Sequence, residues 1–161
     1  MPHDEIPGED GSTEPRPVEM SPAEVDSFVG VGGSGVLALA RDDTPYAIPV
    51  SYGYEPGEER FFLRLGQADD SEKPNFVRSS AAARLVIYAD RPTEARSVVA
   101  KGPLDELPRE QLTPDLVETL SHAQLPRFEL WTQPRADVGF TIYTLDVREL
   151  TGRKAVGEDG S

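Results

Sequence analysis

The sequence has no cysteine, only two histidines, and a single tryptophan in 161 residues. The lack of Cys excludes disulfides, thiolate metal sites and Cys nucleophiles. His3 and His122 are far apart in the sequence, so a His-based metal site is not expected. We expect His122 to be solvated or to cap a helix. A Ser–His–Asp triad through it stays open, although no nucleophile-elbow motif supports one.

Long apolar runs are also missing from the sequence. None approaches the ~20 apolar residues that a membrane-spanning helix needs. The N-terminal stretch is acidic and has no apolar segment of the kind found in signal peptides. We therefore expect a cytoplasmic protein with no membrane contact.

Lysine is scarce, occurring only at positions 73, 101 and 154, and acidic residues (29) outnumber basic ones (16) to give a net charge of −13. High salt screens the self-repulsion of such a charge. The composition resembles that of proteins from halophiles, although an ordinary acidic protein is the alternative. The charge argues against nucleic-acid binding, which requires a basic patch.

The central stretch, Gly33–Tyr54, predicts two strands joined by the polar turn Arg41–Thr44. The first strand, Val36–Ala40, is apolar on both faces, as in a strand of a covered or closed sheet. In the second strand, Pro45–Tyr54, bulky residues alternate with small ones. The small face is either packed against another backbone or open to a flat ligand, and Pro49 within it favours a sheet edge.

The rest of the chain predicts a single domain, 21–154, with a disordered acidic tail at 1–20 and a flexible tail at 155–161. Ser21-Pro22 should start a short helix, with Glu24 completing a capping box, and this helix should end before Gly32-Gly33. A type II turn is expected at Glu55–Glu58.

Four further strands and two further helices are predicted along the chain. The strands should cover Arg60–Leu65, Ala83–Ala89, Arg96–Leu107 (with a bend at Gly102-Pro103) and Val138–Leu150, and the helices Ser71–Ser80 and Thr113–His122. Six strands in hairpin-like succession favour an antiparallel β-barrel, because closure removes exposed edges.

A group of anion-binding residue types follows the third strand. Arg64 ends that strand, and Ser71, Lys73 and Asn75 lie at the start of the next predicted helix. A helix N-terminus offers free N–H groups to a phosphate, and Lys and Arg add positive charge. In the alternative reading, Lys73 pairs with an acidic residue in 69–72 and Arg64 is simply exposed.

The motifs Thr44–Val50 and Lys73-Pro74-Asn75, in this order and spacing, resemble the pyridoxamine 5′-phosphate oxidase-like family of FMN-binding split barrels. The flavin-nucleotide-binding, nitroimidazole-resistance-type branch is the most similar. The likeness covers about Ser21–Leu107. It departs from the family pattern at Leu63-Arg64 and at Pro74, which leaves the phosphate contacts open, and residues specific to pyridoxal phosphate production are not recognisable.

The resemblance implies a mainly β protein, a six-stranded antiparallel split barrel of Greek-key type with a few short helices, that forms a homodimer with FMN at the interface. It further implies a set of cofactor-binding residues: Ile48, Pro49, Val50, Ser51, Phe62, Leu63, Arg64, Ser71, Lys73, Asn75 and Trp131. Trp131 is the candidate for covering the flavin ring from the other subunit; a place in the core or in the dimer interface is the alternative.

The function expected from this resemblance is that of a flavoprotein, an oxidoreductase acting on an unidentified small molecule. No residue is identified as a general acid or base. Two alternatives remain: a reductase using the deazaflavin F420, whose acidic tail would need a longer basic groove, and a non-catalytic module that binds flavin or haem.

Overall fold

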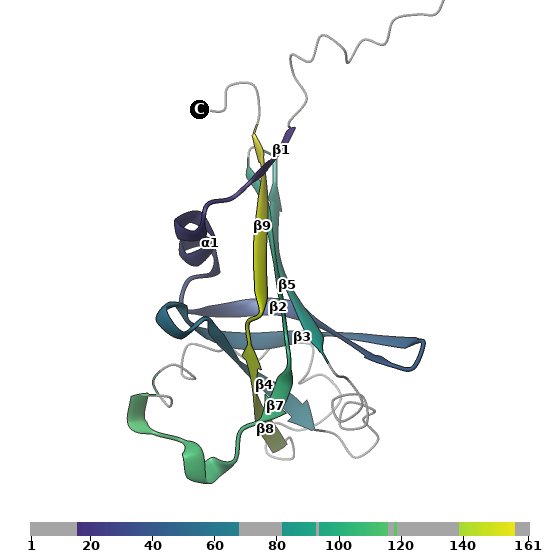
Figure 1. The fold of residues 1–161 in the computed structure, drawn as a ribbon, viewed down its shortest axis with the longest axis vertical. Helices are drawn as coiled ribbons and strands as arrows, with labels where there is room; N and C mark the ends of the chain where they lie inside the picture. Colours follow the sequence, from purple (N-terminus) through teal and green to yellow (C-terminus); the bar gives the residue numbers. More distant parts are fainter. Residues whose placement is uncertain (1–15, 68–81, 93, 116–117, 119–138, 157–161) are drawn as a thin grey trace, which may run out of the picture.

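A computed structural model describes residues 16–67, 82–92, 94–115, 118 and 139–156. Their nine strands form one antiparallel sheet in the order β1-β9-β6-β5-β2-β3-β4-β8-β7 (Figure 1). The strands are β1 Arg16–Glu19, β2 Gly32–Arg41, β3 Thr44–Glu55, β4 Arg60–Gln67, β5 Ala83–Arg91, β6 Glu94–Gly102, β7 Leu104–Glu106, β8 Gly139–Asp146 and β9 Glu149–Val156. The helix α1 spans Pro22–Val29, and short 3₁₀ helices lie at Pro56–Glu58 and Arg109–Gln111. The predicted mainly β, antiparallel class is confirmed.

The strand count is nine instead of the expected six, because two long segments are each divided and residues 16–19 form the additional strand β1. Pro103 separates β6 from β7, as the predicted bend at Gly102-Pro103 implies. The expected last strand stops at Asp146, and β9 starts afresh at Glu149 and runs to Val156, into the segment expected to be a tail. Proline has no N–H group to donate to a β-ladder, which explains why β6 ends and β7 begins at Pro103.

The division of these two segments lets the sheet curl. β6 pairs with β5 and β9, whereas β7, directly after it, pairs with β8. Backbone hydrogen bonds tie the two junctions together: the Arg148 amide donates to the Lys101 carbonyl at 2.7 Å, and the Asp146 amide donates to the Pro103 carbonyl at 3.3 Å. The β8–β7 end of the strand order is thereby brought against β6.

The core lies inside the curled sheet and follows the alternation of the strands. Phe61, Leu63 and Leu65 of β4 are fully buried and point into it, as their period-two spacing predicts. Leu37 and Leu39 of β2 enter the same cluster. The face of the sheet away from this cluster is called the outward face below.

The hairpin β2–β3 has the predicted turn, and its register runs from Arg41↔Thr44 to Gly32↔Gly53. The ladder between β3 and β4 covers only Ser51–Glu55, so within the described residues the first part of β3 pairs with β2 alone. Pro45 and Pro49 lie in that part. Residues an even number of positions apart on a strand direct their N–H groups to the same side, so the two prolines lack this group on the same side of β3. That side faces away from β2, so no hydrogen bond between β2 and β3 is lost.

The helix α1 begins as predicted. The Ser21 side chain accepts from the Glu24 amide at 3.2 Å, and the Glu24 carboxylate accepts from the Ser21 amide at 2.9 Å, which completes the capping box. The helix ends before Gly32-Gly33, as expected, but these two glycines do not cap it. Gly30 caps the helix with φ 67°, and the two later glycines belong to β2.

Two other local expectations are corrected. The Glu55–Glu58 turn is not type II: Pro56–Glu58 form a 3₁₀ helix, and the left-handed residue is Glu59, with φ 49°. Residues 16–20 are not a disordered tail, because β1 pairs with β9 and Met20 is buried in the core. The expected helix Ser71–Ser80 and most of Thr113–His122 lie outside the described residues.

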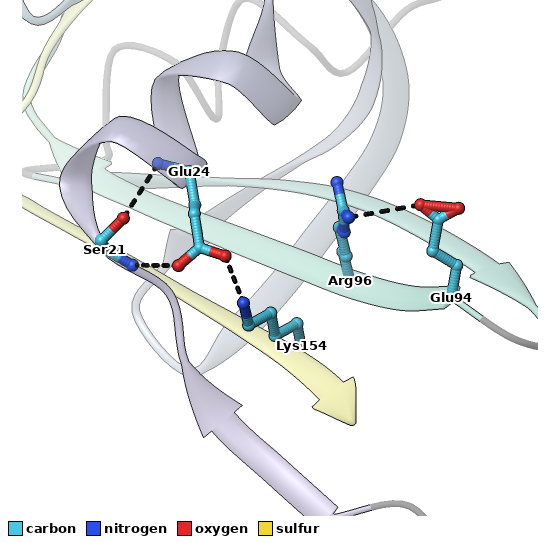
Figure 2. Close-up of polar contacts among 5 residues, drawn as sticks. All are labelled: Ser21, Glu24, Glu94, Arg96 and Lys154. Carbon is cyan, nitrogen blue, oxygen red and sulfur yellow. Dashed lines mark hydrogen bonds and ion pairs between the residues drawn. The ribbon is translucent and has the colours of Figure 1, made fainter. Parts of the chain in front are cut away.

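Three side-chain contacts hold α1 against the barrel. The Tyr52 hydroxyl donates to the Val29 carbonyl at 2.8 Å, and burial raises the pKa of Tyr52 to about 12. The Tyr54 hydroxyl donates to Asp26 at 3.1 Å. Lys154 of β9 pairs with Glu24, beside the separate pair of Arg96 and Glu94 (Figure 2).

The Glu24–Lys154 pair predicts a pH-dependent stability. Hydrogen bonding to Lys154, together with the Ser21 amide, lowers the pKa of Glu24 from 4.5 to about 2. A lowered pKa stabilises the folded state above pH 4.5, and this contribution is lost as pH falls from 4.5 toward 2. Glu24→Gln keeps the capping box but removes the charge, so we expect a Tm below that of wild type at pH 7 and a difference that disappears as the pH falls to about 2.

This prediction is checked by thermal unfolding of both proteins at intervals from pH 7 to pH 2. Glu94→Gln is the matched control, because it breaks the neighbouring ion pair with Arg96 (3.3 Å) without touching α1. Its effect should be small, as is usual for an exposed pair. A difference between wild type and Glu24→Gln that stays constant over the whole pH range would contradict the assignment.

Candidate functional site

A polar row crosses the outward face of the sheet at the centre of β3. Ser51 of β3 pairs with Ser34 of β2 on one side and with Arg64 of β4 on the other. Directly paired residues project to the same face, so the three side chains lie abreast. Ser34 is exposed, Arg64 is half-buried and Ser51 is completely buried.

The Ser51 hydroxyl is exceptional within the described part of the chain. Its oxygen is buried and has no hydrogen-bond partner. An unpaired buried hydroxyl costs about 1–3 kcal/mol, so native structures rarely keep one without a use for it. It lies one strand away from the half-buried Arg64, which brings a cation and a hydroxyl together.

The next row of the same face supplies an aromatic wall. Phe62 of β4 pairs with Gly53 of β3 and with Thr144 of β8, and it is fully buried although it points away from the main core. The guanidinium carbon of Arg60 lies 6.0 Å from its ring centroid, at the outer limit of a cation–π contact. Gly53 leaves the side of this ring next to β3 without a side chain.

The structure divides the predicted cofactor residues into three sets. Pro49, Ser51, Phe62 and Arg64 share the outward face, on adjacent rows of β3 and β4. Ile48, Val50 and Leu63 point to the core, so only their backbones face the row. The remaining four, Ser71, Lys73, Asn75 and Trp131, lie outside the described residues.

Ser34 was not predicted to be a site residue, although the sequence indicates its position beside Ser51. A two-residue turn at Asp42-Asp43 fixes Arg41 opposite Thr44, and counting back along the hairpin places Ser34 opposite Ser51. The burial of Ser51, in contrast, depends on the strands and segments around it.

The described residues contain neither a metal-binding cluster nor a membrane-spanning helix. No group of three or more His, Cys, Asp or Glu side chains there is arranged to hold a metal ion. Within the same residues, no helix has the length and hydrophobicity to cross a membrane.

These features define a small antiparallel β-barrel protein with a partly buried polar row on the outside of its sheet. The family model described as pyridoxamine 5′-phosphate oxidase matches residues 21–154, and the chain belongs to this family. The match contains β2, β3 and β4, the strands that carry the polar row.

The chain is also similar to individual proteins in sequence or in fold. An uncharacterized protein of Rhizobium meliloti is 33% identical over 94 residues, which span 57% of this chain and 58% of that relative. A FAD-binding protein from Mesorhizobium loti has a similar fold, with a TM-score of 0.64 and 19% identity over 88% of this chain and 98% of its own. A putative 5-nitroimidazole antibiotic resistance protein from Bacteroides thetaiotaomicron gives a TM-score of 0.63, with 11% identity over 88% of this chain and 89% of its own.

Proposed function

We propose that this protein binds FMN on the outward face of β3 and β4, as a homodimer, and acts as an oxidoreductase on a small molecule. The buried, unpaired Ser51 hydroxyl beside Arg64 is the observation that carries the proposal. The buried Ser51 hydroxyl and the half-buried Arg64 guanidinium are donors suited to the polar and anionic groups of a flavin nucleotide. The Mesorhizobium loti structure, described as FAD-binding, supports a flavin on this fold.

The residues present fit such a group. Arg64 would bind the phosphate, and the Ser51 hydroxyl would form a hydrogen bond with the ligand. At Pro49 a flat ring would contact the backbone of β3. Lys73, Ser71 and Asn75 remain the proposed further phosphate ligands, and Trp131 the proposed cover of the ring. When bound, the flavin supplies the hydride or electron transfer, and the protein supplies binding and orientation.

An apolar strip on the same face is consistent with a bound flat ring and with contact to a second subunit. Val36, Val86 and Val99 lie abreast on β2, β5 and β6, each only half-buried, and the exposed Pro49 pairs with Val36. Half-exposed apolar residues in a continuous row are typical of a surface that a ligand or another protein covers.

Ser51→Ala tests the proposal by opposite effects on stability and binding. If the hydroxyl serves a ligand, its removal should leave the free protein unchanged or more stable by about 1 kcal/mol, because a buried unpaired group is lost. FMN affinity should fall by about fivefold or more, since one hydrogen bond is worth ~1 kcal/mol. Urea unfolding and fluorescence titration with FMN, at high salt, measure both quantities.

Ser27→Ala, an exposed position on α1, is the matched control and should change neither. A wild-type protein that does not bind FMN would contradict the proposal. So would a Ser51→Ala variant that is markedly destabilised yet binds FMN normally, because the hydroxyl would then have a structural role.

A further inference from the structure

A second site, a shallow and open pocket, lies on the outward face, across β1, β9, β6 and β5. It has a volume of about 600 Å³, within the range of small-molecule pockets. Small or apolar side chains form much of its lining: Pro17, Val86, Ala95 and Ala155. The flavin site proposed above does not account for it.

Three hydrogen-bond donors cross this pocket in one row. Tyr88 of β5 pairs with Ser97 of β6, which pairs in turn with Arg153 of β9, so the three side chains project to the same face. None of the three has a side-chain hydrogen bond or ion pair with another described residue. Tyr88 is 65% exposed, an unusual position for a large aromatic side chain.

Arg153 is the cation that faces the pocket. Arg96 and Lys154 also line it, but they form a row on the opposite face of the sheet, where their side chains pair with Glu94 and Glu24 (Figure 2). Their charges are therefore engaged on the α1 side. The guanidinium of Arg153 keeps its five donors for another partner.

We propose that this pocket binds a small planar organic anion, with Arg153 on its carboxylate, Ser97 as a further donor, and Tyr88 against its ring. Apolar lining with a few convergent polar groups is the usual composition of a small-molecule site. Arg binds a carboxylate through two parallel hydrogen bonds, which gives both affinity and orientation.

Two acidic residues limit the charge of this ligand. Asp90 lines the pocket one row beyond Tyr88, and Glu19 of β1 pairs with Arg153 on its other side. A polyanion would meet both carboxylates. A single carboxylate placed on Arg153 avoids Asp90 and lies beside Glu19 alone, whose negative charge is next to the Arg153 guanidinium. The ligand is therefore a monoanion.

The pocket also suggests what the proposed flavin acts on, a step that depends on the proposed function. Val86 belongs both to the pocket lining and to the apolar strip that leads through Val36 to Pro49. Both sites thus lie on one face, and the planar monoanion is the class of substrate that this arrangement favours.

The test compares 2-naphthoate with its neutral analogue 2-naphthamide, by calorimetric titration into the full chain without flavin. We expect the naphthoate to bind at least tenfold more tightly than the amide. Arg153→Gln should abolish this preference by weakening the naphthoate alone, while Tyr88→Ala should weaken both ligands by severalfold. Arg91→Gln, an exposed arginine at the end of β5, is the matched control and should leave both affinities unchanged.

Equal affinity for the two ligands, or no binding of either at millimolar concentration, would overturn the inference. A preference that survives Arg153→Gln would do so too. If Tyr88→Ala changed the oligomeric state and left ligand binding intact, the pocket would be an interface with a second copy, which also contradicts it.

FMN titration of the same samples separates this inference from the proposed function. FMN affinity should be the same in wild type and Arg153→Gln. If FMN does not bind but the naphthoate preference holds, the proposed flavin fails and the anion pocket stands. If FMN binds and Arg153→Gln weakens it, the pocket is part of the flavin site and the inference fails.

Discussion

Gly102→Ala is expected to destabilise the protein by about 3 kcal/mol or more, because the added Cβ lies in a close-packed site and forces the backbone to move. A Cβ added at Gly102 would lie 1.9 Å from the carbonyl oxygen of Asp146 and 2.9 Å from its carbonyl carbon. Both are backbone atoms, so no side-chain rotation relieves the clash. This contact lies where β6 ends and where β8 meets it, at the junction on which the curling of the sheet depends.

Urea unfolding measures the change in stability, and Gly57→Ala is the matched control. A Cβ at Gly57 meets no atom within 4 Å, so this variant should be neutral or slightly stabilised, by up to about 1 kcal/mol. If both variants unfold at the same denaturant concentration as wild type, the close approach of the two strands is wrong. If Gly102→Ala does not fold, Gly152→Ala gives a second test of close packing. Its Cβ would lie 2.8 Å from Val25 Cγ2 and 2.9 Å from Met20 Sδ, which are side-chain and not backbone atoms, so the loss of stability should be smaller.

Arg64→Ala is expected to weaken FMN binding by about 10- to 100-fold while weakening riboflavin by less than about threefold. A hydrogen bond to a charged group contributes about 1.5–3 kcal/mol, and riboflavin lacks the phosphate that would receive it. Lys73→Ala should show the same selectivity if it also holds the phosphate. Fluorescence titration with each flavin gives the two affinities.

Arg91→Ala and Lys101→Ala are the matched controls for these two variants. Arg91 is exposed at the end of β5, and Lys101 pairs with Glu149 at 3.4 Å, away from the polar row. Both controls should bind FMN as wild type does. Equal losses of FMN and riboflavin in Arg64→Ala would place its role at the ring or in the sheet rather than at the phosphate. Circular dichroism of each variant checks that the barrel is intact.

Local features were predictable because each depends on a few neighbouring residues. The β2–β3 hairpin follows from alternation and a polar turn, and the start of α1 follows from Ser21, Pro22 and Glu24 acting within one helical turn. The two errors of capping and turn geometry are also local. Several nearby residues can take a positive φ, and the choice of Gly30 and Glu59 depends on how the chain enters the next strand.

The site was predictable only in part. Small residues on one face of β3 indicated a place for a flat ligand, and Arg64 indicated an anion. Parity along the strands determines which of the predicted cofactor residues share that face. The burial of Ser51 and Phe62 does not follow from parity, because it depends on segments distant in the sequence. The row of Tyr88, Ser97 and Arg153 joins three strands and had no sequence motif to reveal it.

The sequence by itself therefore determined the class of fold, the central hairpin, the helix cap and the side of β3 that is small. These depend on backbone preferences and on alternation over a few residues. The tertiary structure alone decided that Pro103 passes the chain from β6 to β7, that residues 16–19 close one end of the sheet, and that the Ser51 hydroxyl is buried without a partner. Each of these depends on long-range strand pairing. The free energy of that pairing is shared among residues far apart in the chain, so no single stretch of the sequence reveals it.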